Sequence, residues 1–233
     1  MAHSQHPGIT GSQLHLLQQY IPHARVETLL EQHGVASDRS RKLPADFMVY
    51  FVMAACLYSH LSLRETLRTV LDDRIRSCGS KAKTLRAELA SRSALTQARA
   101  RLGSAMLGDL FQQLVHPCAT KRTPGAYFKR WRVVAIDGTL LALRDTPTNF
   151  AQFDGPGKTI GAGAIPMLRV VTLVECGTHI IFGAALAPYR TGEVSSATAL
   201  LPHLHRGMLC LQDRNYIGYL PGGRPPARRR PIS

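Results

Sequence analysis

The chain has 233 residues, enough for one or two domains, and its 45% apolar and 19% charged residues exclude a wholly disordered protein. Lys and Arg outnumber Asp and Glu by 29 to 15, and this net charge of +14 favours a polyanionic partner, most often a nucleic acid. The five cysteines include no C-x-x-C pair, which argues against a zinc site and favours a reducing, cytoplasmic location. The longest apolar run, residues 47–58, is too short to span a bilayer, so we expect no contact with a membrane.

Residues 1–125 have the periodicity of a helical domain. A first amphipathic stretch ends at Gly34, and Pro44 suits the first turn of the helix that carries the apolar run. Ser62 and Glu65 have the spacing of a capping box, which predicts that a further helix begins there. The polar residues 74–83 are predicted to form a loop.

Two more helices are predicted before residue 125. Ser93 is the expected cap of the first, and Gly103 separates the two. Arg99 and Arg101 crowd the end of the first of these helices, where they are candidates for contact with DNA phosphates. A solvated basic face is the alternative interpretation, since basic surfaces also serve solubility.

Residues 126–220 change to the period of strands. The dipeptides Asp137-Gly138 and Cys176-Gly177 each stand between apolar runs, as in tight turns, and residues 145–163 are predicted to be a loop. A helical segment and a short, buried strand that ends at Asp213 follow. The predicted order is strand, strand, strand, helix, strand, with the first three antiparallel and the last parallel to an earlier one.

Asp137 and Asp213 are the candidate catalytic pair. If the last strand lies beside the first, the two carboxylates meet near the strand ends, where open α/β sheets bind ligands. Two such carboxylates suit Mg²⁺, and two ions can activate a water or a 3′-hydroxyl for phosphodiester chemistry. The alternative is structural: Asp137 serves a hairpin turn and Asp213 caps the segment that follows.

Several motifs resemble DDE transposases of bacterial insertion sequences, in the subgroup numbered four. In the second half they are "VVAIDGTLLALRDTPTN", "FDGPGKTIGAGAIPMLRVVTLVECGTH", "PYRTGE" and "GMLCLQDRNYIGY"; in the first half they are "LPADFMVYFVMAACLYSHLSLRETLRTVL" and "SALTQARARLG". The resemblance runs from about residue 12 to residue 220, and the motifs follow the family's order.

The resemblance implies an α+β chain with a helical amino-terminal DNA-binding domain and an RNase H-like catalytic domain. It also implies catalysis by Mg²⁺ or Mn²⁺, with the first two catalytic carboxylates on Asp137 and Asp213. The implied partner is double-stranded DNA at the terminal inverted repeats of the element, with a homodimer as a plausible assembly and the bacterial nucleoid as the location.

The sequence departs from the family's pattern after Asp213. The pattern continues with a β-rich region and a helix that carries the third carboxylate, whereas residues 221–233, "PGGRPPARRRPIS", match no part of it. We therefore expect a truncated or frameshifted chain with an incomplete RNase H-like domain, a disordered or out-of-frame tail and little catalytic activity. A basic tail that contacts DNA is the alternative.

Four further polar residues have competing interpretations. Glu193 is a candidate metal ligand on the helix after the third strand, although a first-turn Glu that complements the helix dipole is the favoured interpretation. Lys158 and Arg190 are candidates for contact with DNA, and Glu175 is expected to be solvated beside a hairpin turn. Trp131, at the start of a strand, is expected to lie in the core.

Three functions follow from these patterns. The first is DNA transposition by a DDE transposase; the second is a catalytically inactive DNA-binding fragment or remnant of one. The third is an RNase H-like nuclease that uses Asp137, Glu193 and Asp213.

Overall fold

The structure is a computed structural model, and it describes residues 13–37, 43–78, 90–156 and 165–216. It consists of two compact units, Met1–Leu114 and Val115–Ser233. The predicted tail 221–233 and Lys158 lie outside the described residues. In the part of the chain that the structure describes, no helix is both long and apolar enough to cross a bilayer.

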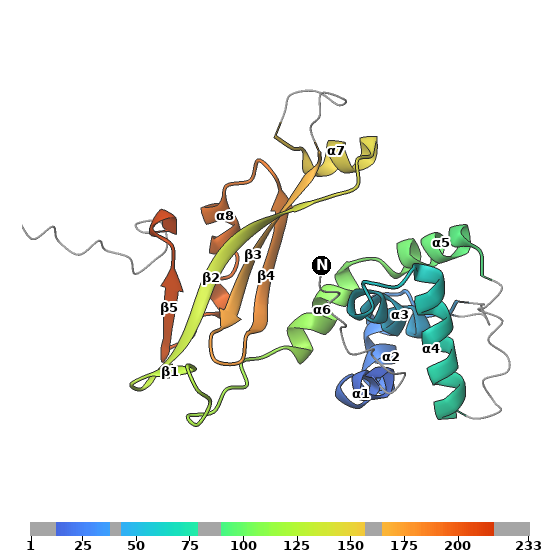
Figure 1. The fold of residues 1–233 in the computed structure, drawn as a ribbon, viewed down its shortest axis with the longest axis horizontal. Helices are drawn as coiled ribbons and strands as arrows, with labels where there is room; N and C mark the ends of the chain where they lie inside the picture. The colour runs from blue at the N-terminus through green and yellow to red at the C-terminus, as the bar shows by residue number, and fades with distance from the viewer. Residues whose placement is uncertain (1–12, 38–42, 79–89, 157–164, 217–233) are drawn as a thin grey trace, which may run out of the picture. The chain divides into compact units, whose positions relative to one another are not determined.

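The first unit is built from helices, as the sequence predicts (Figure 1). They are α1 (Gln13–Tyr20), α2 (His23–Gln32), α3 (Ala45–Leu57), α4 (Leu63–Cys78), α5 (Arg92–Leu102) and α6 (Ala105–Leu114). The apolar helix α3 lies at the centre of this unit, because five consecutive residues, Phe47 to Phe51, are all buried. Apolar residues of α2, α4, α5 and α6 pack around it to complete one core.

The helix ends confirm two of the predicted signals and correct two others. The capping box forms, since the Ser62 backbone N–H donates to Glu65 Oε2 at 2.8 Å and the Glu65 N–H donates to Ser62 Oγ at 3.3 Å. Gly103, with φ of 70°, ends α5. The cap of α5 is Ser91 rather than Ser93, because the Ala94 N–H donates to Ser91 Oγ at 3.2 Å. The predicted loop over 74–83 is wrong for residues 74–78, which continue α4.

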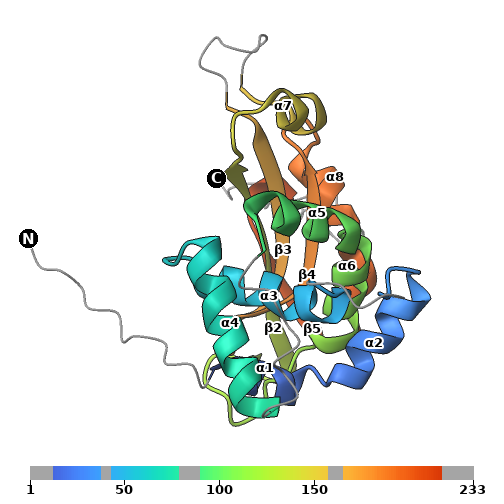
Figure 2. The same ribbon diagram turned by 90° about the vertical axis from the view of Figure 1, so that its right-hand side faces the viewer.

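The second unit contains a mixed sheet with short helices (Figure 2). Its strands are β1 (Tyr127–Phe128), β2 (Trp131–Ala142), β3 (Met167–Glu175), β4 (Ile180–Pro188) and β5 (Met208–Gln212). Its helices are α7 (Pro147–Phe153) and α8 (Glu193–Thr198), with 3₁₀ turns η3 (Leu201–His203) and η4 (Arg214–Tyr216). The chain is therefore an α+β protein: helices first, then a mostly antiparallel sheet.

The strand order confirms the predicted topology. β2, β3 and β4 are antiparallel neighbours, and β5, which follows α8, pairs with β2 in parallel. The short β1 pairs with the first residues of β2. The main sheet therefore has the order β5-β2-β3-β4, and the first long strand is bordered by the last one.

Asp137-Gly138 is not a hairpin turn, so that prediction is wrong. β2 continues through both residues and pairs with β3 at Asp137↔Thr172 and Gly138↔Val171. The turn between β2 and β3 lies beyond Ala142 and includes α7, which falls inside the predicted loop 145–163. Cys176-Gly177 does form the turn between β3 and β4, as predicted.

The core of the second unit lies against one face of the sheet. Val134, Ile136, Val171 and Leu173 point to this face and pack with Ala197 and Leu200 from the α8 segment. The opposite face carries exposed apolar side chains on several strands: Leu141, Ile181, Leu186, Leu209 and Leu211. β5 is therefore not the buried strand that its sequence predicts, because in the described structure it pairs only with β2 and one of its faces is uncovered.

Candidate active site

Asp137 and Asp213 lie at adjacent positions where β2 and β5 run side by side. The parallel pairing ends at Ile136↔Gln212, and the next residue on each strand is the aspartate. Both side chains are exposed, and each accepts a hydrogen bond from the backbone N–H of the residue that follows it, at 2.9 Å for Gly138 N to Asp137 Oδ1. The topology therefore brings together two carboxylates that are far apart in the chain.

Glu193 is the third carboxylate at this end of the sheet. It is the first residue of α8, and its side chain lies directly over Gly138: a Cβ at that glycine would be 2.8 Å from Glu193 Cγ. The Tyr216 hydroxyl donates a hydrogen bond to Glu193 Oε1, and Arg169 Nη1 lies 3.9 Å from Oε2. Glycine at 138 thus leaves space for the Glu193 carboxylate on the α8 face of β2, whereas Asp137, the residue before it, points to the opposite face.

The pKa of Tyr216 is raised by burial and in part by Glu193 and Asp137. Its side chain is 1% exposed, and burial is the main cause that raises its pKa well above the ordinary range. The hydrogen bond to Glu193 and the charges of Glu193 and Asp137 raise the pKa further, and Arg169 opposes them. Tyr216 therefore keeps its proton and acts as a hydrogen-bond donor to Glu193.

The donor set is chemically suited to a hard divalent cation. Carboxylate oxygens are the ligands that Mg²⁺ and Mn²⁺ prefer. Asp213 directly follows β5, Asp137 lies in the middle of β2 beside that end of β5, and Glu193 lies over Gly138. As their side chains stand, no three His, Cys, Asp or Glu residues in the described segments form a group that could hold a metal ion. Two aspartates on adjacent strands, with a glutamate oriented by Tyr216 and Arg169, are what the structure presents.

Three of the residues predicted to contact DNA are in the described structure. Arg99 and Arg101 are exposed in the last turn of α5. Arg190 is exposed too, but its guanidinium forms an ion pair with Asp154. Their contact with DNA stays a prediction.

Glu175 is buried, which overturns the prediction that it is solvated. Its side chain is 0% exposed and accepts hydrogen bonds from the backbone N–H groups of Cys118 at 3.1 Å and Ala119 at 2.9 Å. Arg132 forms an ion pair with it, and the Thr178 hydroxyl donates to it. Burial raises the pKa of Glu175, and these hydrogen bonds outweigh burial, so that the pKa lies below its ordinary value. The carboxylate turns inward because four donors converge on it.

Trp131 opens β2 as predicted, but it is not a core residue. It is 37% exposed, and the Arg130 guanidinium stands 4.9 Å from its ring centroid. The ring is on the sheet face opposite α8, where the described structure provides no covering layer.

Arg169 and Tyr216 are the residues at this site that sequence reasoning missed. Arg169 stands within the apolar run of β3, and a charge in such a run requires a partner, so a signal was present. Tyr216 follows Asp213 in a segment without periodicity, and nothing in the sequence predicts its contact with Glu193.

Comparison with known proteins shows that the chain is similar to transposases. Residues 11–112 match the family described as the insertion element 4 transposase N-terminal domain. The chain is 27% identical over 213 residues to the protein of Escherichia coli (strain K12) named "Putative transposase InsZ", and the match covers 91% of this chain and 67% of InsZ. It is 27% identical over 200 residues to the transposase InsG for insertion sequence element IS4 of the same strain, with 84% of this chain and 42% of InsG covered. No solved structure matches the chain. Residues 11–112 are therefore similar to the amino-terminal domain of insertion element 4 transposases, and most of the chain is similar to transposases of Escherichia coli.

Proposed function

We propose that the chain takes part in DNA transposition, as a DDE-type enzyme that cleaves and transfers strands at the ends of an insertion sequence. The observation that carries this proposal is the register of β2 and β5, which puts Asp137 and Asp213 side by side. Paired carboxylates at the ends of adjoining strands suit metal-dependent phosphodiester chemistry, and the related proteins are named as transposases. An RNase H-like arrangement is consistent with three antiparallel strands, a helix and a parallel strand.

Asp137 and Asp213 would hold a divalent cation, Mg²⁺ or Mn²⁺. The bound ion would activate the attacking water or 3′-hydroxyl and stabilise the leaving oxygen of the phosphodiester. Tyr216 and Arg169 would hold the Glu193 carboxylate in place over Gly138. The third carboxylate of the DDE set is not assigned by this geometry, and its loss from the chain stays a prediction.

The proposed substrate is double-stranded DNA at the terminal inverted repeats. The net charge of +14 supports an attraction to duplex DNA that weakens as salt is added. The helical unit, with exposed Arg99 and Arg101, would hold the transposon end, and two chains would bring two ends together.

Strand cleavage by the full chain tests the proposal. A duplex with an insertion-sequence end is incubated with the chain and Mg²⁺ or Mn²⁺, and nicked products are resolved on a denaturing gel. We expect nicking that falls at least about 10³-fold in Asp137→Asn and in Asp213→Asn, because each removes a metal ligand. Asp109→Asn, an exposed aspartate of the helical unit, is the matched control and should cleave normally. Equal cleavage by all variants would refute the assignment, and binding without cleavage by the parent chain would favour the inactive fragment.

The position of Glu193 supports a second candidate, an RNase H-like nuclease. Its carboxylate lies over Gly138, the residue that follows Asp137 in β2. Glu193→Gln separates the two functions: the nuclease predicts lost hydrolysis of a DNA duplex and of an RNA–DNA hybrid. If Glu193 only complements the α8 dipole, the variant cleaves transposon ends normally.

A further inference from the structure

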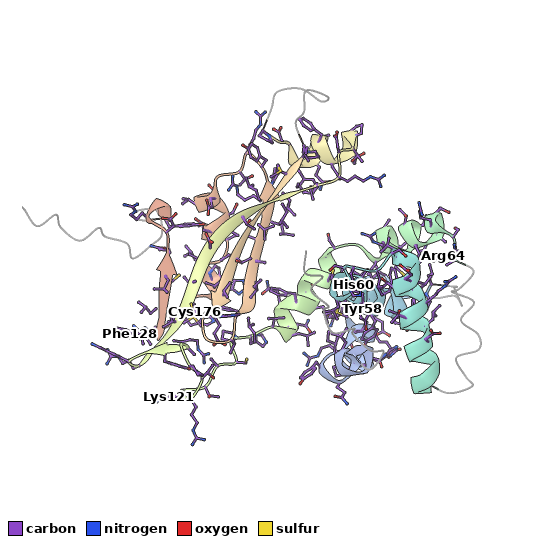
Figure 3. The ribbon with its side chains drawn as sticks, viewed as in Figure 1. Tyr58, His60, Arg64, Lys121, Phe128 and Cys176 are labelled. Atoms are coloured by element: carbon purple, nitrogen blue, oxygen red, sulfur yellow. The ribbon has the colours of Figure 1, made fainter. Side chains whose placement is uncertain are left out.

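Two β-turns of the second unit each carry a Lys-Arg pair at their two central positions. Lys121 and Arg122 are the middle of the turn closed by the Thr123 N–H donating to the Thr120 carbonyl at 2.9 Å. Lys129 and Arg130 are the two residues that join β1 to β2. The side chains at the centre of a β-turn point away from the turn. All four cations are exposed. Figure 3 labels Lys121 and Phe128, which extend from this end of the sheet.

The charges of the two turns are not neutralised by neighbours. The sequence from Val115 to Ile136 contains no Asp or Glu. In the described structure, none of the ion pairs involves Lys121, Arg122, Lys129 or Arg130. Glu175, the acid that reaches this segment, is buried and paired with Arg132. The turns therefore present four cations with no compensating negative charge in the segment that carries them.

One buried carboxylate fixes both turns. Glu175 accepts from the N–H groups of Cys118 and Ala119, just before the first turn, and pairs with Arg132, just after the second. Between the turns, Ala126 packs so closely on Gly177 that a Cβ there would be 2.7 Å from Ala126 Cα. The two Lys-Arg pairs are thus held on a rigid base.

Lys129 occupies a backbone conformation that favours glycine. Its φ is 56°, at the first central position of a two-residue hairpin, where glycine is the usual residue. A lysine in the left-handed region is strained, and strain of this kind suggests a use for the side chain. Lys129 and Arg130 also stand over the exposed rings of Phe128 and Trp131, at 5.6 and 4.9 Å from the ring centroids.

We propose that these twin Lys-Arg turns are a contact site for the phosphate backbone of duplex DNA. Two exposed pairs of cations are complementary in charge to the phosphate backbone of a duplex. Arg130 in the second turn is about 23 Å from Asp137, at about 3.3 Å per residue along β2. DNA held by this turn would therefore extend over about seven base pairs before it reaches Asp137, at about 3.4 Å per pair.

Binding of the full chain to duplex DNA, measured by fluorescence anisotropy over a range of salt concentrations, tests this site. The inference rests on the proposed function for its ligand, so the probes are a terminal-repeat duplex and an unrelated duplex of equal length. We expect Lys121→Gln/Arg122→Gln and Lys129→Gln/Arg130→Gln each to weaken binding to both duplexes by about tenfold or more at 0.1 M salt. Each double variant should also reduce the slope of log K against log salt by about two.

Two controls separate contact with DNA from folding. Lys121→Arg/Lys129→Arg keeps every charge and should bind like the parent chain. Lys129→Gly relieves the strained φ, so its thermal midpoint should not fall while its binding to DNA weakens. If Lys129 has only a structural role, Lys129→Gly should lower the thermal midpoint and leave binding to DNA unchanged.

The outcomes distinguish this site from the proposed function. Unchanged affinity and salt slope in both Gln variants would overturn the site, even if Asp137→Asn abolishes cleavage. A parent chain that binds duplex through the turns but never cleaves it would overturn the proposed function alone. Binding to anionic lipid vesicles, with none to either duplex, would also overturn the site as a DNA contact.

Discussion

The helical unit buries apolar side chains all around α3, whereas the sheet unit buries them on one face of its sheet. In the helical unit, Phe47 to Phe51 are buried whichever way they point. In the sheet unit, Leu173 is buried towards α8, and Leu186, on the opposite face of the neighbouring strand, is 67% exposed. The first unit therefore has a core that is closed by its own helices, and the second has a core that is closed on one side.

Polar and charged side chains also have different roles in the two units. In the helical unit, polar residues such as Ser62 and Glu65 satisfy helix ends. In the sheet unit, cations and a carboxylate lie at different places along β2: Lys129 and Arg130 directly before it, and Asp137 in its middle. This separation of the cations from the carboxylate along one strand suits the long anionic ligand that we propose.

The largest expected effect on stability is at Glu175. Glu175→Gln would leave the Arg132 charge without its buried partner, at a cost of about 3–5 kcal/mol in the free energy of unfolding. The measurement is chemical denaturation of the full chain. Glu193→Gln is the matched control: its carboxylate is 31% exposed and 3.9 Å from its arginine, so a smaller loss is expected. An equal loss in both variants would contradict the special role of the buried pair.

The pH dependence of stability follows from the same carboxylate. The pKa of Glu175 is lower in the folded chain than its ordinary value of 4.5. Its contribution to stability is therefore fully present above about pH 4.5 and is lost as the pH falls through the lowered pKa. In the Gln variant this part of the acid sensitivity should disappear, which a series of denaturation curves between neutral and acid pH would show.

Much of the fold was predictable because the spacing of apolar residues in the sequence indicates which side chains are buried. The apolar run of α3, the Ser62 capping box and the parallel return of β5 to β2 were all predicted from residue patterns. The placement of Asp137 next to Asp213 follows from that topology alone.

The errors occur where long-range contacts override a local pattern. Asp137-Gly138 has the sequence of a turn, but the glycine serves the close approach of Glu193 instead. Glu175 follows an apolar strand next to a turn, and only the folded chain brings Cys118, Ala119 and Arg132 to it. No local pattern could show either contact, because the partners are distant in the sequence.

Gly138→Ala tests the contact between Gly138 and Glu193. The added Cβ would overlap the flexible Glu193 side chain, so we expect a loss of about 1–3 kcal/mol in the free energy of unfolding as that side chain is displaced. The Tyr216 hydroxyl would then lose its acceptor, and the raised pKa of Tyr216 should move back towards its ordinary value of 10.0. Titration of tyrosinate absorbance, compared with a Tyr216→Phe control, measures this change; an unaltered titration would mean that Glu193 does not depend on the space at Gly138.

Ser91→Ala tests the N-cap of α5 in the helical unit. Ser91 Oγ accepts from the Ala94 N–H, and loss of an N-cap of this kind costs about 1 kcal/mol. Ser93→Ala is the matched control, since Ser93 lies inside α5 and alanine favours a helix. Hydrogen exchange of the first amides of α5 in the full chain should quicken in Ser91→Ala alone. Faster exchange only in Ser93→Ala would instead support the cap expected from the sequence.

The smallest expected effect is on the uncovered sheet face. Leu186→Ala should change the free energy of unfolding by no more than about 0.5 kcal/mol, because its side chain is already mostly in solvent. Leu173→Ala, on the covered face of the next strand, is the matched control and should cost about 2–5 kcal/mol. Since both are leucines in paired strands, the difference between them measures how unequally the two faces are buried. A loss at Leu186 as large as at Leu173 would mean that this face is covered in the folded protein, and the contrast between a closed helical core and a one-sided sheet core would no longer hold.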